Sequence, residues 1–461
     1  MADRIPAASE LEATLGWFVK DRRLAGAAAG VVCGDGATWS GGAGYADLAS
    51  GTMADPATLY RVASITKTFT GTAVMQLRDA GLLDLDEPAI TYLPEMRDSA
   101  RLDARVGLVT VRRMLAHASG LASEPPGTDW AIPRYQGLVA LTLGQPGAIA
   151  TRVPAGQHPK YSNLAYQLLG EVVARTARTT YVEYMQEKVL LPLEMDATSF
   201  DPAADFPRQL PATGYAPRAF SDELDIASVM PPLWAEGGLW SSVEDLIKWV
   251  SAQLAAHRGS VIGTAILSGV SLREMHAPRY LEGSDWTQAW GLSWCAVRRD
   301  DAVWIQHSGA LPGFSTAVCF DPEGQVGGVA LINGSADAAG LAMDLAGIVL
   351  KAARTRPPRI RRPEPTPEAF RSLLGLYSRG GYSHVIRLEW RDGRLTFIDP
   401  EDHRWRPVLT PTDDPDVFTV EPGYRESGEP VTFHRLPDGR IDSVFIAAGT
   451  WRRLERVEQL D

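Results

Sequence analysis

Apolar residues recur at helical spacing directly after Ser64. Phe69, Ala73, Val74 and Leu77 stand at i, i+4, i+5 and i+8, so a helix would carry them on one face. Ser64 would then lie in the first turn, where backbone N–H groups have no partner within the helix and the helix dipole is positive. The pattern therefore predicts a helix that presents a serine at its N-terminal end.

Other stretches predict further helices and strands. Helices are expected near Leu11, from Val109 to Leu115 and from Asn163 onward. Alternating or branched apolar residues predict strands at Ala27–Cys33, Ala37–Ser40, Gly44–Ala46, Ala302–Gln306 and Gly313–Phe320. Glycine-rich turns would join the first three strands, and the segment His307–Ala310 would form the turn between the last two. The opening order of helix, strand and strand would lay a helix against an antiparallel sheet.

The composition changes beyond Leu350. Residues 351–367 hold five prolines and a dense set of arginines, which is typical of a stiff, solvated linker. Short apolar segments separated by Asp-Gly turns then predict a small antiparallel barrel, with strands at Val385–Trp390, Leu395–Ile398, Val417–Val420, Val431–His434, Ile441–Ala447 and Trp451–Leu454. We therefore expect a main domain at residues 1–352, a Pro/Arg-rich linker at 353–368 and a barrel without chemistry of its own at 369–461.

Composition and charge exclude several classes of function. With 461 residues, 45% of them hydrophobic, the chain can bury a large core, and a net charge of -11 argues against nucleic acid and anionic membranes as main partners. The three cysteines are odd in number and far apart, and no Cys/His pattern suggests zinc, so neither a disulfide framework nor a metal or other cofactor is expected. The first residues lack an apolar stretch of signal-peptide length, which predicts a cytoplasmic location. The oligomeric state does not follow from the sequence.

Ser64 and Lys67 form a candidate nucleophile and base. The chain has six lysines, and only Lys67 follows a serine by three residues. Residues three apart on a helix share a face, so the amine would return to the hydroxyl. A serine hydroxyl needs a base within reach, and a lysine amine held neutral by burial can be that base.

Two further segments carry candidate site residues. Tyr161 and Asn163 stand just before or at the start of a predicted helix, where a phenol can shuttle a proton and an amide can hold a substrate carbonyl and accept from Lys67. In the third segment Gly309 permits close backbone approach, which would leave the N–H of Ala310 free to point into a cleft. Paired with the N–H of Ser64, it would form an oxyanion hole, worth on the order of 3 kcal/mol per donor.

Each segment taken alone has a purely structural explanation. Ser64 could be a helix N-cap followed by a surface lysine, and Asn163 an N-cap that follows a core tyrosine. His307 could be a structural or surface histidine. Trp130, Trp234, Trp240, Trp290 and Trp294 could wall an apolar cleft, although large aromatic residues are more often part of the core.

Taken together, the three segments resemble a known superfamily. Ser64-Ile-Thr-Lys67, Tyr161-Ser-Asn163 and His307-Ser-Gly309, in this order, look like the three motifs of the serine β-lactamases and penicillin-binding proteins, in the class C-like branch that includes family VIII carboxylesterases, D-aminopeptidases and acyltransferases. Supporting stretches are Met114–Leu121, Gly237–Leu246 and Trp290–Trp294, and the match covers about residues 8 to 352. The resemblance implies an α+β fold with an antiparallel sheet flanked by helices and an all-helical subdomain, and it implies that the C-terminal barrel is lipocalin-like.

The third motif departs from the family pattern. The β-lactamases of this branch carry lysine where this chain has His307, and a neutral or half-protonated imidazole holds a substrate carboxylate more weakly than an ammonium does. The resemblance therefore implies an acyl-enzyme on Ser64 formed from a small ester or amide, with Lys67 and Tyr161 as bases and Asn163, His307, Gly309 and Ala310 in substrate binding. Transfer of the acyl group to an alcohol or amine, β-lactam hydrolysis and D-amino-acid peptidase activity stay open as alternatives.

Overall fold

The computed structural model describes most of the chain. Described are residues 5, 7–125, 142–145, 147–206, 211–217, 224–227, 234–258, 265–299, 302–355, 365–378, 385–391, 393–399, 406–421, 427–446 and 449–454. The chain divides into two compact units, Met1–Arg356 and Pro357–Asp461. Each unit has a hydrophobic core of its own.

A nine-stranded antiparallel sheet forms the centre of the first unit, with strands in the order β3-β2-β1-β13-β12-β11-β10-β9-β8. In chain order its strands are β1 (Gly26–Cys33), β2 (Thr38–Asp47), β3 (Thr52–Met53), β8 (Tyr280–Leu281), β9 (Gln288–Trp290), β10 (Cys295–Arg299), β11 (Ala302–Leu311), β12 (Phe314–Asp321) and β13 (Val326–Ile332). Strand β1, from the start of the unit, thus pairs with β13, from its end, while β2 pairs with β1 and β3. Two short ribbons pair β4 (Tyr60–Arg61) with β7 (Trp240–Ser241) and β5 (Tyr215–Pro217) with β6 (Leu224–Ile226).

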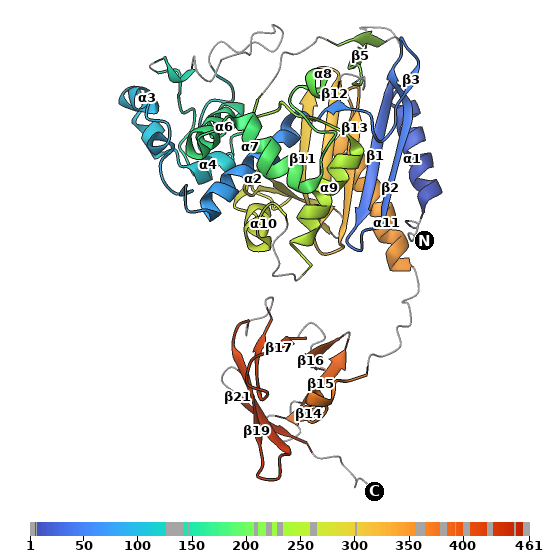
Figure 1. Ribbon diagram of the computed structural model, residues 1–461, viewed down its shortest axis with the longest axis vertical. Coiled ribbons are helices and arrows are strands. Elements are labelled where there is room, and N and C mark those ends of the chain that lie inside the picture. The colour runs from blue at the N-terminus through green and yellow to red at the C-terminus, as the bar shows by residue number, and fades with distance from the viewer. Residues whose placement is uncertain are drawn as a thin grey trace. The chain divides into compact units, whose positions relative to one another are not determined.

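Strand β1 is buried on both faces, because helices cover the sheet on both sides. Ala27, Ala29 and Val31 join the core under α1 (Ala8–Asp21) and α11 (Ala338–Thr355), whereas the alternate residues Ala28 and Val32 join the core under α9 (Val243–Ala255). Figure 1 shows the sheet between these helices. Short, mostly apolar residues along β1 allow this close packing on both faces.

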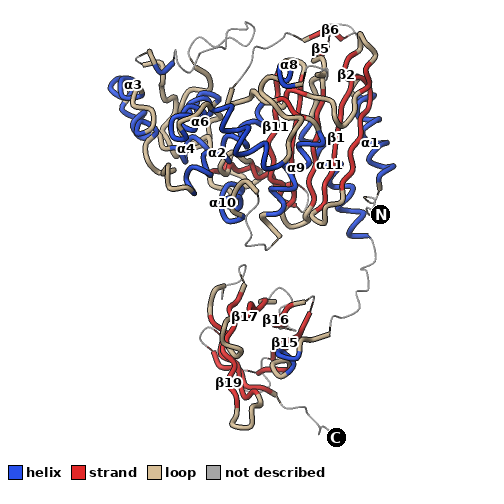
Figure 2. Tube along the Cα trace, viewed as in Figure 1, coloured by secondary structure: helices blue, strands red, loops and turns tan. Residues whose placement is uncertain are grey.

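A helical lobe lies beside the sheet. Its elements are η1 (Ala63–Ile65), α2 (Thr66–Asp79), η2 (Ala89–Thr91), α3 (Met96–Leu102), η3 (Ala104–Leu108), α4 (Val111–Leu115), α6 (Asn163–Ala177), α7 (Tyr181–Met185), the π-helical turn η4 (Gln186–Leu190), η5 (Leu191–Leu193) and α10 (Gly269–His276). The short helix α8 (Pro202–Asp205) is drawn next to β12 in Figure 1. Figure 2 separates the helices of the lobe from the strands of the sheet by colour.

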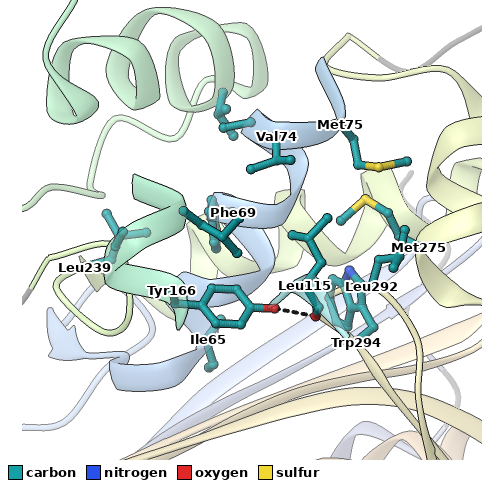
Figure 3. Close-up of a cluster of buried hydrophobic side chains, with 14 of the residues drawn as sticks. Ile65, Phe69, Val74, Met75, Leu115, Tyr166, Leu239, Met275, Leu292 and Trp294 are labelled. Atoms are coloured by element: carbon teal, nitrogen blue, oxygen red, sulfur yellow. Dashed lines mark hydrogen bonds between the residues drawn. The ribbon is translucent and has the colours of Figure 1, made fainter. Parts of the chain in front are cut away.

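Helix α2 is the centre of the lobe and is buried almost completely. Its residues from Thr66 to Met75 are all buried, and Phe69 stacks on Trp249 of α9 with ring centroids 3.8 Å apart. Figure 3 shows Phe69 with Ile65 and Val74 among the apolar side chains of this core, together with the hydrogen bond from the Tyr166 hydroxyl to the Leu115 carbonyl. Packing therefore fixes α2, the helix that carries Lys67 and directly follows the turn of the candidate serine.

The second unit is a closed antiparallel barrel. Its elements are α12 (Glu368–Arg371), β14 (Gly375–Ser378), β15 (Val385–Arg391), β16 (Arg394–Ile398), β17 (Val408–Pro411), β18 (Val417–Val420), β19 (Pro430–Arg435), β20 (Ile441–Ile446) and β21 (Gly449–Arg453). Strand β14 pairs with β21 and closes the barrel. Aromatic side chains, among them Tyr377, Phe397, Phe418 and Phe433, fill its interior.

The predicted α+β fold with a C-terminal barrel is confirmed, but several local predictions are wrong. His307–Ala310 does not form a turn: it continues β11, and a two-residue turn at Pro312-Gly313 joins β11 to β12. Gly41 and Gly42 likewise lie inside β2 and not in a turn. A Cβ at Gly42 would lie 2.0 Å from the carbonyl oxygen of Ala54, so this close approach requires a glycine. Strands β14 and β17 were not predicted.

In the described part of the chain, no helix combines the length and the apolar character needed to cross a bilayer. The cytoplasmic location expected from the N-terminal sequence stays a prediction.

Removal of the Phe69 ring should destabilise the first unit. Phe69 is fully buried, so Phe69→Ala leaves a cavity against Trp249 and should cost about 3–5 kcal/mol in the free energy of unfolding. Denaturant titration followed by tryptophan fluorescence measures this cost. Leu82→Ala, at a side chain that is 57% exposed, serves as the control and should cost much less. An equal loss in both variants would contradict the central role of α2 in the core.

Candidate active site

Ser64 follows a strained turn at the start of the helical run. Ala63 has a φ of 50°, in the left-handed region that residues with a Cβ rarely adopt. Thr66 Oγ1 donates to the Ala63 carbonyl over 2.7 Å and accepts from the N–H of Leu239 at 3.2 Å, so the turn is held by hydrogen bonds. The side chain of Ser64 is half-buried and lines a cavity.

Lys67 lies one turn further along, fully buried. Its Nζ lies 3.0 Å from Ser64 Oγ and 2.5 Å from the backbone carbonyl oxygen of Glu236, to which it donates. The same Nζ lies 5.0 Å from the ring centroid of Tyr161 and 5.5 Å from that of Tyr166, within cation–π range. Among the described residues no carboxylate forms an ion pair with this amine. The amine is therefore held by a carbonyl and two aromatic faces, directly beside the serine hydroxyl.

Tyr161 precedes α6 and packs against His117. The two rings stack with centroids 4.1 Å apart, and the backbone N–H of Ser162, the N-cap of α6, donates to His117 Nδ1 over 3.2 Å. Burial, with a smaller contribution from Lys67, lowers the pKa of His117 well below its usual value, so this imidazole is neutral. In the described part of the chain the Tyr161 hydroxyl makes no hydrogen bond, which leaves it available to a substrate.

Asn163 does not have the contact with Lys67 that the sequence suggested. Its Nδ2 donates to Glu124 Oε1 over 2.5 Å, and its Oδ1 has no hydrogen-bond partner. The sequence suggested that Asn163 would accept from Lys67. In the structure the carbonyl of Glu236 takes that place, and Asn163 lines the cavity with Ser64.

Gly309 lets β11 lie directly against the turn that holds Ser64. A Cβ at this position would lie 2.4 Å from the carbonyl oxygen of Val62 and 2.6 Å from Thr316 Oγ1, closer than nonbonded atoms approach. Thr316 Oγ1 itself donates to the Val62 carbonyl over 2.9 Å and ties β12 to the same turn. A side chain here would force the strand and the serine apart.

The backbone of Ala310 is directed toward the cavity. Because the turn after β11 holds two residues, the flanking residues Leu311 and Phe314 form a hydrogen-bonded pair. Along an antiparallel ladder such pairs alternate with pairs that are not hydrogen-bonded, and Ala310 with Ser315 is a pair of the second kind. The N–H of Ala310 therefore points away from β12, at a position beyond the end of the pairing with β10. Ala310 and Ser64 both line the cavity, as an oxyanion hole built from their two N–H groups requires.

His307 is neutral and fixed in one tautomer. Burial, followed by the influence of Lys67, lowers the pKa of His307 to about 3. A neutral imidazole has one N–H, and the 2.7 Å contact of Nδ1 with the Ser308 carbonyl oxygen places the proton on Nδ1. The Nε2 atom then carries a lone pair and has no partner. At this position the chain presents an acceptor rather than a cation.

A cavity of about 580 Å³ brings these residues together. Its walls include the predicted site residues Ser64, Tyr161, Asn163, His307 and Ala310, and also Ser308 on β11. Lys67 and Gly309 are not among the lining residues: Lys67 is buried beside Ser64, and Gly309 packs within β11 against the carbonyl of Val62. Three segments far apart in the sequence thus meet at one cavity.

Glu236 and His117 were not singled out from the sequence. Glu236 is 2% exposed, its backbone carbonyl holds Lys67, and its Oε1 accepts from Gln167 Nε2 over 3.0 Å. No sequence pattern marks a residue that acts through its backbone carbonyl. His117 stands inside the stretch Met114–Leu121 that supported the family resemblance, and this was the signal that could have found it.

The tryptophans do not form a common wall. Trp290 lines the cavity, but Trp294 is fully buried in the core and Trp240 stacks against the guanidinium of Arg61. Trp234 is 45% exposed, and Trp130 lies outside the described residues. Across the described ranges no group of three or more His, Cys, Asp or Glu side chains is placed to hold a metal ion.

An antiparallel sheet beside a helical lobe, with a serine and a buried lysine where they meet, is the architecture of serine hydrolases that act by acyl transfer. The family model described as Beta-lactamase matches residues 11–353, and the chain belongs to this family. The resemblance drawn from the three motifs is thereby confirmed.

Known proteins share this region at low identity. Protein flp of Staphylococcus aureus (strain COL) is 27% identical over 297 residues, which are 63% of this chain and 56% of that protein. The chain thus spans little more than half the length of this curated relative.

Solved structures share the fold over most of their length. The octameric penicillin-binding protein homologue from Pyrococcus abyssi matches with a TM-score of 0.64 at 20% identity, covering 96% of this chain and 99% of that one. D-alanine carboxypeptidase AmpC from Burkholderia cenocepacia matches with a TM-score of 0.59 at 23% identity, covering 75% and 99%. At these identities the matches show a common fold.

A methyl group at position 309 should disable the site. Gly309→Ala places a Cβ against the Val62 carbonyl and should slow labelling of Ser64 by a fluorophosphonate at least about tenfold, because β11 must move away from the serine. Gly347→Ala is the matched control: a Cβ at Gly347 in α11 meets no atom within 4 Å. Unchanged labelling in Gly309→Ala would contradict the need for close approach.

Proposed function

We propose that this protein is a serine hydrolase that forms an acyl-enzyme on Ser64 from a carboxylic ester or amide. The observation that carries the proposal is the 3.0 Å contact between Lys67 Nζ and Ser64 Oγ, in which a buried amine adjoins a serine at the wall of a cavity. Membership of the Beta-lactamase family supports a serine hydrolase in general terms. The ester or amide substrate is the more specific part of the proposal.

Lys67 and Tyr161 transfer the protons. Lys67 accepts the hydroxyl proton as Ser64 Oγ attacks the substrate carbonyl carbon. Tyr161, whose ring lies against the same amine, passes a proton to the leaving group as the bond to it breaks. A water molecule, activated by the same pair, then attacks the acyl-serine and releases the acid.

Backbone N–H groups stabilise the negative charge that develops on the substrate carbonyl oxygen. The N–H of Ser64 lies in the first turn of a helical run, where it has no acceptor within the helix, and the N–H of Ala310 is directed away from the strand ladder. Both residues line the cavity. Two fixed donors stabilise the tetrahedral intermediate without reorganising during the reaction.

The neutral imidazole of His307 supports the proposed substrate class. Its imidazole is neutral and presents a lone pair, so it offers no positive charge to a substrate carboxylate. This favours neutral esters and amides over the carboxylate-bearing β-lactams and D-Ala-D-Ala peptides that the family resemblance also implies.

Mass spectrometry of the intact protein tests the proposal. Brief exposure to a panel of esters, amides and β-lactams, with and without an added amine or alcohol, should give a covalent adduct whose mass names the acyl group. Ser64→Ala should form none. Faster loss of the adduct with an added acceptor would assign an acyltransferase, and rapid turnover of β-lactams would assign a β-lactamase. No adduct with any member of the panel would contradict the proposal.

The two bases should each be needed for acylation. Lys67→Ala and Tyr161→Phe should each lower the acylation rate by at least about a hundredfold, as expected for loss of a proton-transfer group. Stopped-flow measurement of leaving-group release gives this rate. The exposed residues Lys20 and Tyr45 provide matched controls, Lys20→Ala and Tyr45→Phe, which should acylate normally. A near-normal rate in either site variant would remove that residue from the mechanism.

A further inference from the structure

His117 occupies a backbone position that favours glycine. It is the first residue beyond the C-cap of α4, and its φ is 54°. Its N–H donates to the Met114 carbonyl over 3.2 Å, and the N–H of Ala118 donates to the Arg113 carbonyl over 2.7 Å. Helices that end in this way most often carry glycine here, because a Cβ is unfavourable in the left-handed region. Such strain is found chiefly at functional sites, where surrounding contacts maintain it.

The imidazole of His117 adds a second local cost. Burial keeps the pKa of this fully buried ring well below its usual value, so the ring is neutral. Because Nδ1 accepts from the N–H of Ser162, the proton of the ring is on Nε2, and this atom has no hydrogen-bond partner in the described part of the chain. Glycine would avoid the strain, and phenylalanine would avoid the unpaired N–H. The local fold alone therefore does not explain a histidine at this position.

His117 holds the backbone on both sides of Tyr161. The N–H of Lys160 donates to the His117 carbonyl oxygen over 2.6 Å, and the N–H of Ser162 donates to His117 Nδ1 over 3.2 Å. Lys160 and Ser162 are the two neighbours of Tyr161 in the chain. A protonated imidazole has an N–H at both nitrogens, so the contact with Ser162 requires the neutral ring.

The imidazole also orients the ring of Tyr161. The two rings stack with centroids 4.1 Å apart and 27° between their planes, and Trp290 meets the His117 ring at nearly a right angle, at 4.6 Å. Tyr161 is 36% exposed, and within the described ranges its hydroxyl makes no hydrogen bond. Contacts of the ring, rather than a hydrogen bond, therefore set the direction of the phenol.

We propose that His117 is a positioning residue for Tyr161: its carbonyl oxygen, its Nδ1 and its ring together hold the phenol where it protonates the leaving group. This inference rests on the proposed function, which assigns that proton transfer to Tyr161. The proton leaves the Tyr161 hydroxyl as the bond between the acyl carbon and the leaving oxygen or nitrogen breaks. The proton that Lys67 took from Ser64 then replaces it. A displaced phenol would slow this step in particular.

The leaving group shows which step a variant affects. A p-nitrophenolate leaves as a stable anion and needs no proton, whereas an alkoxide or an amine must be protonated as it leaves. A variant that only destabilises the protein lowers the fraction of active enzyme, and so it lowers kcat/KM for every substrate by the same factor. A variant that displaces Tyr161 should lower kcat/KM most for poor leaving groups.

Butyrate esters of p-nitrophenol, phenol, trifluoroethanol and ethanol, which share one acyl group, test the inference. His117→Leu removes the Nδ1 acceptor and the stacking ring, and it should lower kcat/KM for the ethyl ester at least about tenfold more than for the p-nitrophenyl ester. His117→Asn suits a left-handed backbone and keeps an acceptor for Ser162 but lacks the ring, so its selective loss should be smaller, at least about threefold.

His276→Leu is the matched control. His276 is a buried histidine of α10 that hydrogen-bonds to His257 and Gln253, and it does not line the cavity. Its replacement should leave the ratio of kcat/KM between the esters unchanged.

A double variant connects His117 to Tyr161. Tyr161→Phe should show the same selective loss for poor leaving groups. His117→Leu combined with Tyr161→Phe should be no more selective than Tyr161→Phe alone, because no phenol remains to be positioned.

The outcomes separate the inference from the proposed function. An equal loss for all four esters in His117→Leu, or in His117→Asn where only that variant folds, would assign His117 a purely structural role and overturn the inference. A double variant in which the two selective losses multiply would overturn it as well. Acylation of Ser64 without any selectivity in Tyr161→Phe would contradict both the proton transfer assigned to Tyr161 and the inference. No acylation of Ser64 by any ester would contradict the proposed function as a whole.

Discussion

The contact between the buried amine of Lys67 and the hydroxyl of Ser64 is the interaction on which the candidate site depends. An amine removed from water needs acceptors, and Lys67 finds the serine oxygen and the carbonyl of Glu236. Because neither acceptor is a carboxylate, the amine is not locked in an ion pair and stays free to exchange a proton with the serine. The aromatic faces of Tyr161 and Tyr166 complete its surroundings without adding a formal charge.

The fold holds this contact in place from several directions. Helix α2 is packed into the lobe by Phe69, while β11 lies against the turn before Ser64 because position 309 has no side chain. The left-handed backbone of Ala63 is tolerated because Thr66 and Thr316 hydrogen-bond to the turn. A rigid sheet on one side and a buried helix on the other thus fix the distance between serine, amine and backbone donors.

The same geometry gives the cavity its chemical character. Two side chains of the cavity wall direct their donors elsewhere: Asn163 donates to Glu124, and His307 donates to the carbonyl of Ser308. Glu236 also lines the cavity, but its side chain is buried, and burial raises the pKa of its carboxyl. The third motif thus presents a neutral imidazole at the position where the family pattern has a lysine.

The sequence by itself determined the helix after Ser64, the three motifs and most strands of the barrel, because these depend on local spacing and on residue type. In a segment this short, the sequence pattern of a strand resembles that of a glycine-rich turn. Only the tertiary structure therefore decided that His307–Ala310 is a strand and not a turn. Only the structure showed that a backbone carbonyl, and not Asn163, accepts from Lys67. Every residue has a carbonyl, so which one meets a distant amine depends on how the chain folds, not on the identity of the residue that bears it.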